Sequence, residues 1–376
     1  MLAVGLFIKG GVAFAMPLPS EQLVGDYTLS VIAMGKTYEF SYPEIDTYLG
    51  ELYLKNAEEV VEGIYFDTAV KPVDASVKIY PERENPFEYT AEKNGEGIDK
   101  SELIKDIKTA LYARKRIIYA KKVALFPTVY EAELRKNTAL LSSFSTDYSS
   151  SSAERKTNIK LAVKTIGGKE IKSGETFSFN SVVGERSAER GYRQAKIIEN
   201  GKFTDGLGGG ICQVSSTLYN AVLLSGLTVT ERHNHSLAVS YVEPSFDAMV
   251  NSGSSDLKFK NEKDKSLYIV ASCDGGKVKF RVYGTKDGYV YKRVSKVTGY
   301  ISPPEEEIIK NAELPLGERK VITSAKKGIK SEGYIEKYYN GKLTERKKLS
   351  EDTYAPVKGV IEVGTKSETV LPEVFG

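Results

Sequence analysis

A glycine-dense loop that runs into an apolar helix constrains the fold of this chain more than any other segment. Residues 206–210 hold four glycines, residues 211–225 keep helical spacing of apolar side chains, and Gly226 ends the pattern. Cys212 falls in the first helical turn, where unpaired N–H groups and a partial positive charge favour the thiolate. The segment therefore predicts a nucleophilic thiol, with the amides from Gly209 to Cys212 placed to hold an oxyanion.

The only two histidines of the chain, His233 and His235, follow this helix closely. A short turn and a returning strand would bring them near Cys212, and histidine is the usual base for a catalytic thiol. Residues two apart in a strand share a face, so both would face the thiol; we predict His235 as the acid/base and His233 as second or supporting. Asp247 and Asp256 are candidates to orient a histidine. Two alternatives stay open, a metal site completed by either aspartate and a structural polar cluster.

Cys273 is the other cysteine, and the two cysteines show no CxxC spacing typical of a zinc site. A single disulfide is one interpretation for an exported chain. Because the local contexts of the two cysteines differ, we predict one functional thiol and one core cysteine. Arg186 and Arg190 could hold a substrate carboxylate, and ordinary surface charges are the alternative.

Charge and the N-terminal segment bear on the location of the protein. The 53 basic and 50 acidic residues give a net charge of +3, without the basic excess of nucleic-acid proteins. Residues 1–16 are apolar and end in Ala13, Phe14 and Ala15 before Met16, a pattern typical of an export-signal cleavage site. We predict the remnant of an export signal or membrane anchor there; an ordinary buried strand or helix is the alternative. No other segment is predicted to cross a membrane.

The patterns predict an α+β, multi-domain protein. Residues 17–140 form a mixed α/β domain, in which Asp99 and Glu102 make the capping box of a helix and residues 116–129 form a strand. Residues 141–286 form a central α+β domain, with strands that include residues 237–242. Residues 304–366, with strand-like runs between glycines and few aliphatic residues, form a small all-β module with a thin core, suited to binding.

The central segment resembles the VanW family from about residue 143 to residue 284. The specific match is the run Gly-Gly-Gly-Ile-Cys-Gln-Val-Ser-Ser-Thr-Leu-Tyr-Asn-Ala over residues 208–221, supported by Glu-Arg-His-Asn-His-Ser over residues 231–236. The region that ends near Asp99 resembles a peptidoglycan-binding domain found before VanW domains. Residues 304–366 resemble a G5 domain, a β module of surface proteins associated with glycans that contain N-acetylglucosamine.

The resemblance implies an extracytoplasmic, cell-wall associated protein, either secreted or membrane-anchored. It implies an L,D-transpeptidase that uses Cys212, with no metal or cofactor, to form 3–3 cross-links between peptidoglycan stem peptides, and an L,D-carboxypeptidase if water replaces the acceptor amine. A role in vancomycin resistance comes from the family name alone. The predicted oxyanion and substrate-binding residues are Gly208, Gly209, Gly210, Gln213, Ser215, Arg186 and Arg232.

Two other functions stay open at this point. A non-catalytic wall-binding protein would hold glycan strands with its outer modules and position stem peptides with its middle domain. A cysteine hydrolase would cleave a different amide of the envelope. Thiol reactivity separates the first from an enzyme, because a binding module has no reason to lower the pKa of Cys212.

Overall fold

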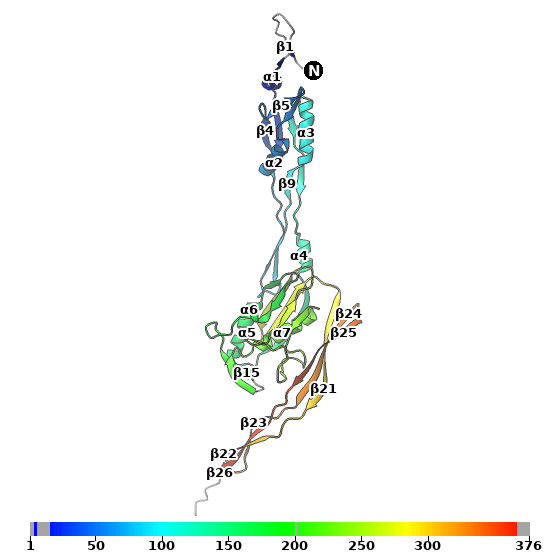
Figure 1. The fold of residues 1–376 in the computed structure, drawn as a ribbon. Helices are drawn as coiled ribbons and strands as arrows, with labels where there is room; N and C mark the ends of the chain where they lie inside the picture. The colour runs from blue at the N-terminus through cyan, green and yellow to red at the C-terminus, as the bar shows by residue number, and fades with distance from the viewer. Residues whose placement is uncertain (1–3, 6–15, 200–201, 367–376) are drawn as a thin grey trace, which may run out of the picture. The chain divides into compact units, whose positions relative to one another are not determined.

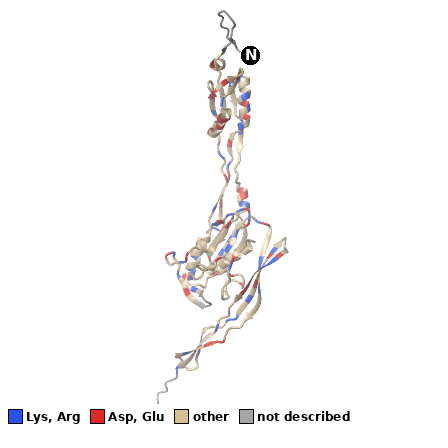
Figure 2. Cartoon of the chain, in the orientation of Figure 1, with Lys and Arg blue, Asp and Glu red and all other residues tan. Residues whose placement is uncertain are grey.

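The computed structural model describes residues 4–5, 16–199 and 202–366 (Figure 1). The chain divides into two compact units, one of residues 1–77 and 89–134 and one of residues 78–88 and 135–376. Most of the predicted signal or anchor at residues 1–16 lies outside the described residues. Within the described ranges, no helix is long and apolar enough to span a membrane. Basic and acidic residues are interspersed along the ribbon (Figure 2).

The first unit is a mixed α/β domain, as predicted. The capping box is confirmed, since the Asp99 side chain accepts from the Glu102 amide at 3.0 Å at the start of α3. The strand predicted over residues 116–129 is instead two short strands, because β10 pairs with β3 and β11 pairs with β9 in a different sheet. The elements are α1 (Ser20–Val24), α2 (Ala57–Thr68), α3 (Lys100–Tyr112), β1 (Val4–Gly5), β2 (Met16–Pro17), β3 (Leu29–Ala33), β4 (Lys36–Phe40), β5 (Ile45–Tyr48), β6 (Glu51–Leu54), β9 (Gly95–Ile98), β10 (Ile117–Tyr119) and β11 (Lys122–Leu125).

A hairpin of β7 (Ser76–Ile79) and β8 (Phe87–Thr90) carries residues 78–88 into the second unit. The Phe87 ring lies edge-on to Tyr268 and Tyr283, with centroids 5.7 and 4.9 Å away. Arg281 donates to the main-chain oxygen of Glu84 at 2.9 Å. The predicted N-terminal domain of residues 17–140 is thus interrupted by a segment that packs with the central domain.

The central domain is built on an antiparallel sheet in the order β12-β20-β19-β13. A smaller sheet has the order β14-β18-β17, and β15 and β16 form a hairpin. The elements, led by α4 (Glu131–Asn137), are β12 (Ala139–Asp147), α5 (Ala153–Ile166), β13 (Lys169–Ile171), β14 (Thr176–Ser178), α6 (Phe179–Val183), β15 (Gln194–Glu199), β16 (Lys202–Leu207), α7 (Ile211–Leu224), β17 (Thr228–Glu231), β18 (Lys258–Lys260), β19 (Leu267–Asp274) and β20 (Lys277–Gly284).

The helix α7 lies in the middle of this domain and is buried on nearly all sides. Its apolar residues Val214, Leu218 and Val222 are fully buried in a core that also takes in side chains of α5 and the main sheet. Its polar residues are buried as well and are paired, for example Thr217 with Thr146 of β12 at 2.8 Å. The helix is therefore a rigid support for the cysteine at its N-terminus.

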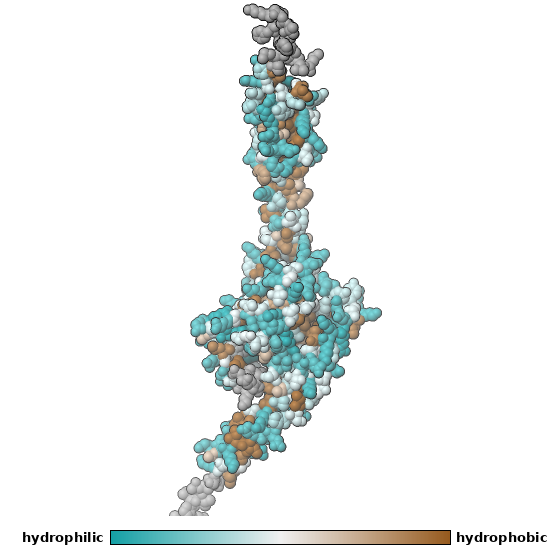
Figure 3. Space-filling view, viewed as in Figure 1, coloured by the Kyte–Doolittle hydropathy of each residue, from teal (hydrophilic) through white to brown (hydrophobic). Residues whose placement is uncertain are grey.

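The C-terminal β domain starts earlier than the predicted residue 304, because β21 pairs along its whole length with β24. Its sheets have the orders β21-β24-β25 and β22-β26-β23. Many of its aliphatic side chains stay exposed, among them Ile308 and Val321, as a thin core predicts (Figure 3). The strands are β21 (Tyr289–Ile301), β22 (Glu307–Pro315), β23 (Arg319–Thr323), β24 (Gly328–Tyr339), β25 (Lys342–Tyr354) and β26 (Val360–Lys366).

Candidate active site

The glycine loop is held tightly rather than loosely. The amide of the buried Asn158 side chain, on α5, donates to the main-chain oxygens of Arg193 at 2.9 Å and Gly209 at 3.0 Å. Gly210 precedes α7 with φ of 107°, which favours glycine, and a Cβ there would meet Ile159 at 2.9 Å. The glycines thus let the loop pack closely against α5 and present Cys212 at the start of the helix.

Gly209→Ala is expected to destabilise the second unit by about 2 kcal/mol, because a Cβ there would lie 2.8 Å from the backbone of Ala195. Urea unfolding followed by circular dichroism measures the change. Gly299→Ala is the matched control, since a Cβ on that glycine meets nothing within 4 Å, and we expect a change within about 0.5 kcal/mol. Equal stability of the two variants would contradict the close packing of the loop.

Cys212, His235 and Asp247 lie next to one another, with His235 between the thiol and the carboxylate. The Nδ1 atom of His235 lies 2.6 Å from Asp247 Oδ2, and its backbone N–H donates to the same oxygen at 2.7 Å. The other ring nitrogen is left for Cys212, and the two side chains are close enough for each to shift the pKa of the other. In the thiol form, Cys212 Sγ can also donate to the Val250 oxygen at 3.4 Å. The geometry is that of a nucleophile, a base and an orienting carboxylate.

The electrostatics of this arrangement favour a thiolate beside an imidazolium. Burial raises the pKa of Cys212, but the hydrogen bond and charge of His235 outweigh it, so that the pKa lies below its ordinary value. Burial lowers the pKa of His235, but its bonds to Asp247 and Cys212 raise it to about 9. At neutral pH the imidazolium is therefore the main form, and it holds the thiolate as its counter-ion.

Asp247 is fixed by partners on both of its oxygens. Arg232 donates through Nη2 to Oδ1 at 2.8 Å and through Nε to the main-chain oxygen of Asp247 at 2.6 Å. Burial raises the pKa of Asp247, but His235 and Arg232 outweigh it and keep the carboxylate charged. Arg232 was predicted to bind substrate; its side chain is only 8% exposed, so it anchors Asp247 instead.

His233 and Asp256 do not join the triad. The prediction that both histidines share one strand face is wrong, because β17 ends at Glu231 and beyond it His233 makes a single bridge with Met249. The His233 ring lies 3.3 Å from a Glu231 oxygen and is 44% exposed. Asp256 accepts from Ser178 Oγ at 2.5 Å and from the Asn180 amide at 2.9 Å.

These placements bear on the metal alternative as well. His233 and Asp256 have other partners, and among the described residues no group of three or more histidine, cysteine or acidic side chains is placed to hold a metal ion. The strand predicted over residues 237–242 does not form. This stretch is an irregular loop, and its residues Ala238 and Val239 line a cavity at Cys212.

Two polar residues of α7 that were predicted to bind substrate have structural partners. Gln213 donates from its buried amide to Thr146 at 3.0 Å and to the main-chain oxygen of Asp147 at 2.7 Å. Ser215 donates to the main-chain oxygen of Ala248 at 2.6 Å. Both side chains tie α7 to neighbouring segments, and Gln213 also lines the cavity at Cys212.

The cavity at Cys212 has a volume of about 510 Å³, and the described residues that line it include basic but no acidic side chains. Its cations are Arg155, Arg186, Lys196 and Lys326. Arg186 is half-buried and donates to Asn180 at 2.6 Å, whereas Arg190, the other predicted arginine, does not line the cavity. An anionic ligand fits this lining.

Tyr241, which sequence reasoning missed, also lines the cavity. Burial raises its pKa well above the ordinary value, and the nearby Cys212 and Asp247 add to that effect. Its phenol is therefore neutral at neutral pH and can act as a donor. Arg155 was missed as a site residue too, because it lies on α5, more than fifty residues before Cys212 in the chain.

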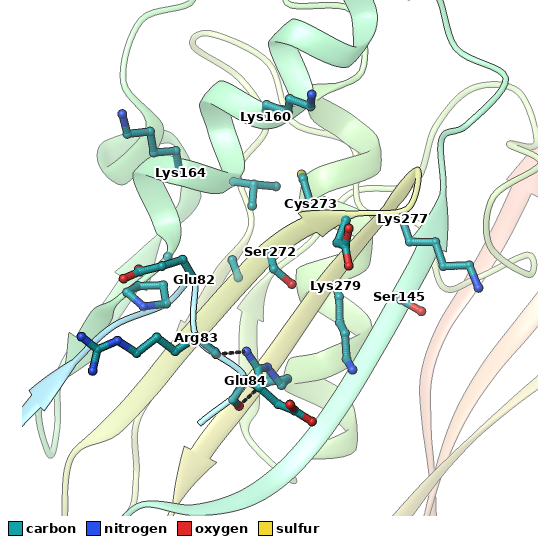
Figure 4. Close-up of a pocket in the computed structure, with 16 residues that line it drawn as sticks. Glu82, Arg83, Glu84, Ser145, Lys160, Lys164, Ser272, Cys273, Lys277 and Lys279 are labelled. Carbon is teal, nitrogen blue, oxygen red and sulfur yellow. Dashed lines mark hydrogen bonds between the residues drawn. The ribbon is translucent and has the colours of Figure 1, made fainter. Parts of the chain in front are cut away.

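Cys273 lines a different cleft, of about 1060 Å³, in which it lies among Lys160, Lys164, Lys277 and Lys279 (Figure 4). Both cysteines are free, so the disulfide interpretation is wrong for this structure. Burial raises the pKa of the Cys273 thiol, and neither histidine lines its cleft. Although this cleft is the larger one, only the cavity at Cys212 combines a thiol of lowered pKa with a histidine in its lining.

Comparison with known proteins divides the chain into three parts. Residues 154–283 match the family model described as "VanW like protein", residues 293–366 match "G5 domain", and residues 47–118 match "Putative peptidoglycan binding domain". Two solved structures of G5 domains are similar to a part of the chain. An IgA1 protease G5 domain is 29% identical and covers 21% of this chain and 90% of its own, with a TM-score of 0.16. The HP0197-G5 crystal structure is 26% identical and covers 20% and 97%, with a TM-score of 0.12.

Two curated relatives match the chain in sequence. The uncharacterized protein YoaR of Bacillus subtilis (strain 168) is 39% identical over 170 residues, which are 45% of this chain and 56% of YoaR. The vancomycin B-type resistance protein VanW of Enterococcus faecalis (strain ATCC 700802 / V583) is 36% identical over 135 residues, which are 34% of this chain and 49% of that protein. The chain thus spans about half the length of these relatives.

The domain content is that of a cell-wall associated, extracytoplasmic protein. The segment that carries Cys212, His235 and Asp247 lies wholly inside the residues matched by the VanW model. The predicted resemblance is confirmed: the chain carries a peptidoglycan-binding type of domain, a VanW domain and a G5 domain in that order, and the family model described as VanW like matches its central domain.

Proposed function

We propose that this protein is a cysteine-dependent L,D-transpeptidase that acts on peptidoglycan stem peptides. The observation that carries the proposal is the Cys212–His235–Asp247 triad at the start of a buried helix, in a cavity with basic side chains. The substrate class rests on the outer domains and on the resemblance of the central domain. A stem peptide ends in a carboxylate, which suits the charge of the cavity.

The reaction begins with attack of the Cys212 thiolate on the carbonyl carbon of the third residue of a donor tetrapeptide. His235, protonated in the resting state, gives its proton to the nitrogen of the departing D-alanine, and a thioester remains on Cys212. The Ile211 amide already donates to Gly208 at 3.1 Å, so the oxyanion would be held by the other amides of the run from Gly209 to Cys212, with that of Cys212 in the first helical turn.

The second half of the reaction restores the resting site. The side-chain amine of a second stem attacks the thioester, His235 takes a proton from that amine, and the thiolate leaves. The product is a 3–3 cross-link, and the imidazolium and thiolate are paired again. Water in place of the amine gives a trimmed stem and makes the same site a carboxypeptidase. No metal or cofactor takes part in either route.

Incubation of the protein with a disaccharide-tetrapeptide, followed by mass spectrometry of the products, tests the proposal. A dimer that has lost one D-alanine supports transpeptidation, and a trimmed monomer supports the carboxypeptidase route. Unchanged substrate, with a folded protein whose Cys212 is alkylated readily, would contradict both the transpeptidase and the carboxypeptidase routes. Hydrolysis of another envelope amide would then be the remaining enzymatic function.

Arg186→Gln is expected to raise KM for the tetrapeptide about tenfold and to change kcat by less than about threefold, because the guanidinium holds a carboxylate in both ground and transition states. Steady-state kinetics with the disaccharide-tetrapeptide measure both constants. Arg190→Gln is the control, since Arg190 is exposed and its guanidinium donates to Glu185 outside the cavity. An unchanged KM in Arg186→Gln would remove this residue from the substrate site.

The second candidate function is a wall-binding protein without catalysis. The peptidoglycan-binding and G5 matches support it as well as they support an enzyme. The discriminating observation is the lowered pKa of the half-buried Cys212, which binding alone does not require. A Cys212 that alkylates with the pH dependence of an ordinary thiol would favour the binding function.

A further inference from the structure

The triad is held from outside the central domain. Four consecutive residues of the C-terminal β domain, at the end of β25 and just beyond it, bond to the segment that carries His235 and to Asp247. They are Asp352, Thr353, Tyr354 and Ala355. This contact belongs to the second unit, which contains both domains.

Two of these residues act on the carboxylate and its anchor. The Tyr354 hydroxyl, on a side chain that is 1% exposed, donates to Asp247 Oδ1 at 2.6 Å. Asp352 accepts from Arg232 Nη1 at 2.7 Å, while the same guanidinium binds Asp247. Arg232 is therefore shared between an aspartate of the triad and an aspartate of the other domain, and all three charges are buried.

The other two residues hold the backbone on each side of His235. The Ala355 amide donates to the main-chain oxygen of Ser236 at 2.7 Å. The Asn234 side chain donates to the main-chain oxygen of Thr353 at 3.3 Å. Beyond β17 this segment is a loop without regular interstrand hydrogen bonds. The bonds to Thr353 and Ala355 therefore give its backbone the support that a neighbouring strand would give.

Other contacts dock the β domain firmly beside this point. The Ser245 amide donates to the Tyr354 hydroxyl at 2.8 Å, and Ser245 Oγ lies 2.7 Å from Ser331 Oγ of β24. Arg293 of β21 lies over the rings of Phe144 and Phe246 of the central domain, 4.5 and 4.6 Å from their centroids. The interface is packed and polar groups in it are paired, so it can transmit position to Asp247.

We infer that the active site is assembled from two domains, with Tyr354 and Asp352 as positioning residues that hold the Asp247–His235 pair in its reactive geometry. The central domain alone supplies the nucleophile and base, and the β domain supplies the constraint on the orienting carboxylate. This inference deepens the proposed function and rests on the same thiol site, but its test does not require turnover.

Nitrogen-15 NMR of the imidazoles in the full chain measures the effect, because only two histidines give signals. We expect His235 in the wild type to titrate near its raised pKa of about 9. Asp352→Asn should lower that midpoint by about one pH unit. The variant removes a buried negative charge that favours the imidazolium. The positive charge of Arg232 is then balanced by Asp247 alone, which leaves less negative charge to stabilise protonated His235.

Glu332→Gln is the matched control, since it removes an acidic charge from β24, where Glu332 pairs with Lys348 at 2.7 Å. Its His235 midpoint should stay that of the wild type. An unchanged midpoint in folded Asp352→Asn would overturn the inference, whether or not the protein proves to be a transpeptidase.

Tyr354→Phe keeps the packed ring and removes only the hydroxyl, so it tests the inference should Asp352→Asn fail to fold. We expect the proton on Nδ1 of His235 to exchange faster with solvent and its downfield signal to broaden, because the Asp247 carboxylate is held less firmly. With substrate, kcat should fall about tenfold at unchanged KM. Tyr338→Phe, whose hydroxyl donates to Glu336 at 2.7 Å, is the control. A signal and kcat equal to those of the wild type in Tyr354→Phe would contradict a positioning role.

Discussion

Cys212→Ala is expected to reduce turnover of the disaccharide-tetrapeptide by about 10⁴-fold or more, to the background rate. The physical reason is that the thiolate forms the covalent bond to the donor, and alanine offers no group that can replace it. Because Cys212 lines a cavity, its truncation should leave the unfolding transition close to that of the wild type. Product formation by mass spectrometry and thermal unfolding by circular dichroism measure the two effects.

Cys273→Ala is the control for this variant. It removes the other thiol of the chain, which lies in a separate cleft and has a pKa raised by burial. We expect its turnover to stay within about twofold of the wild type. Equal losses in the two variants would point to a general effect of thiol removal, and full activity in Cys212→Ala would exclude the proposed mechanism.

His235→Ala is expected to lower kcat by about 10³-fold to 10⁴-fold and to change the pH dependence of alkylation at Cys212. In the wild type, burial raises the pKa of this thiol and the imidazolium more than offsets it. Without His235 the effect of burial is opposed only by the weaker effects of the Val250 backbone and of the Arg186 charge, so the midpoint of iodoacetamide alkylation should move to higher pH. The rate at neutral pH should therefore fall in the variant.

His233→Ala is the control, because His233 is exposed and bonded to Glu231 rather than to Cys212. Its kcat and alkylation midpoint should stay near those of the wild type. If His233→Ala reproduced the losses and His235→Ala did not, the base would have to be reassigned.

Local patterns in the sequence were sufficient for the parts of the site that lie close together in the chain. The glycine loop, the helix over residues 211–224 and the cysteine in its first turn follow from glycine chemistry and helical periodicity. The capping box at Asp99 is equally local, because the cap and its partner are three residues apart. These features depend on interactions within one or two turns of backbone.

The sequence could not decide between His233 and His235 because that choice depends on where β17 ends. A strand continued through both histidines would have turned them to one face, but β17 ends at Glu231 and the following loop turns only His235 inward. The choice between Asp247 and Asp256 was open for a similar reason. The Asp256 carboxylate accepts hydrogen bonds from Ser178 and Asn180 at the start of α6. No local pattern in the sequence predicts that contact.

The contribution of the β domain was out of reach for sequence reasoning. Tyr354 lies 107 residues after Asp247, and Asp352 lies 120 residues after Arg232, in a module with its own strand pattern. Only the packing of two domains brings these side chains to the triad. The structural partners of Arg232, Gln213 and Ser215 were out of reach for the same reason, since each side chain bonds to a residue that is distant in the sequence.

The most direct test of the central claim is to trap the acyl-enzyme. The protein is mixed with the donor tetrapeptide without an acceptor, quenched in acid within seconds, and examined by intact-mass and peptide-mapping mass spectrometry. We expect an adduct with the mass of the donor less D-alanine on the wild-type peptide that holds Cys212, most abundant at short times. The Cys212→Ala variant should carry no such adduct. A folded protein whose Cys212 alkylates at neutral pH but carries no such adduct would contradict the claim that this thiol acts on stem peptides.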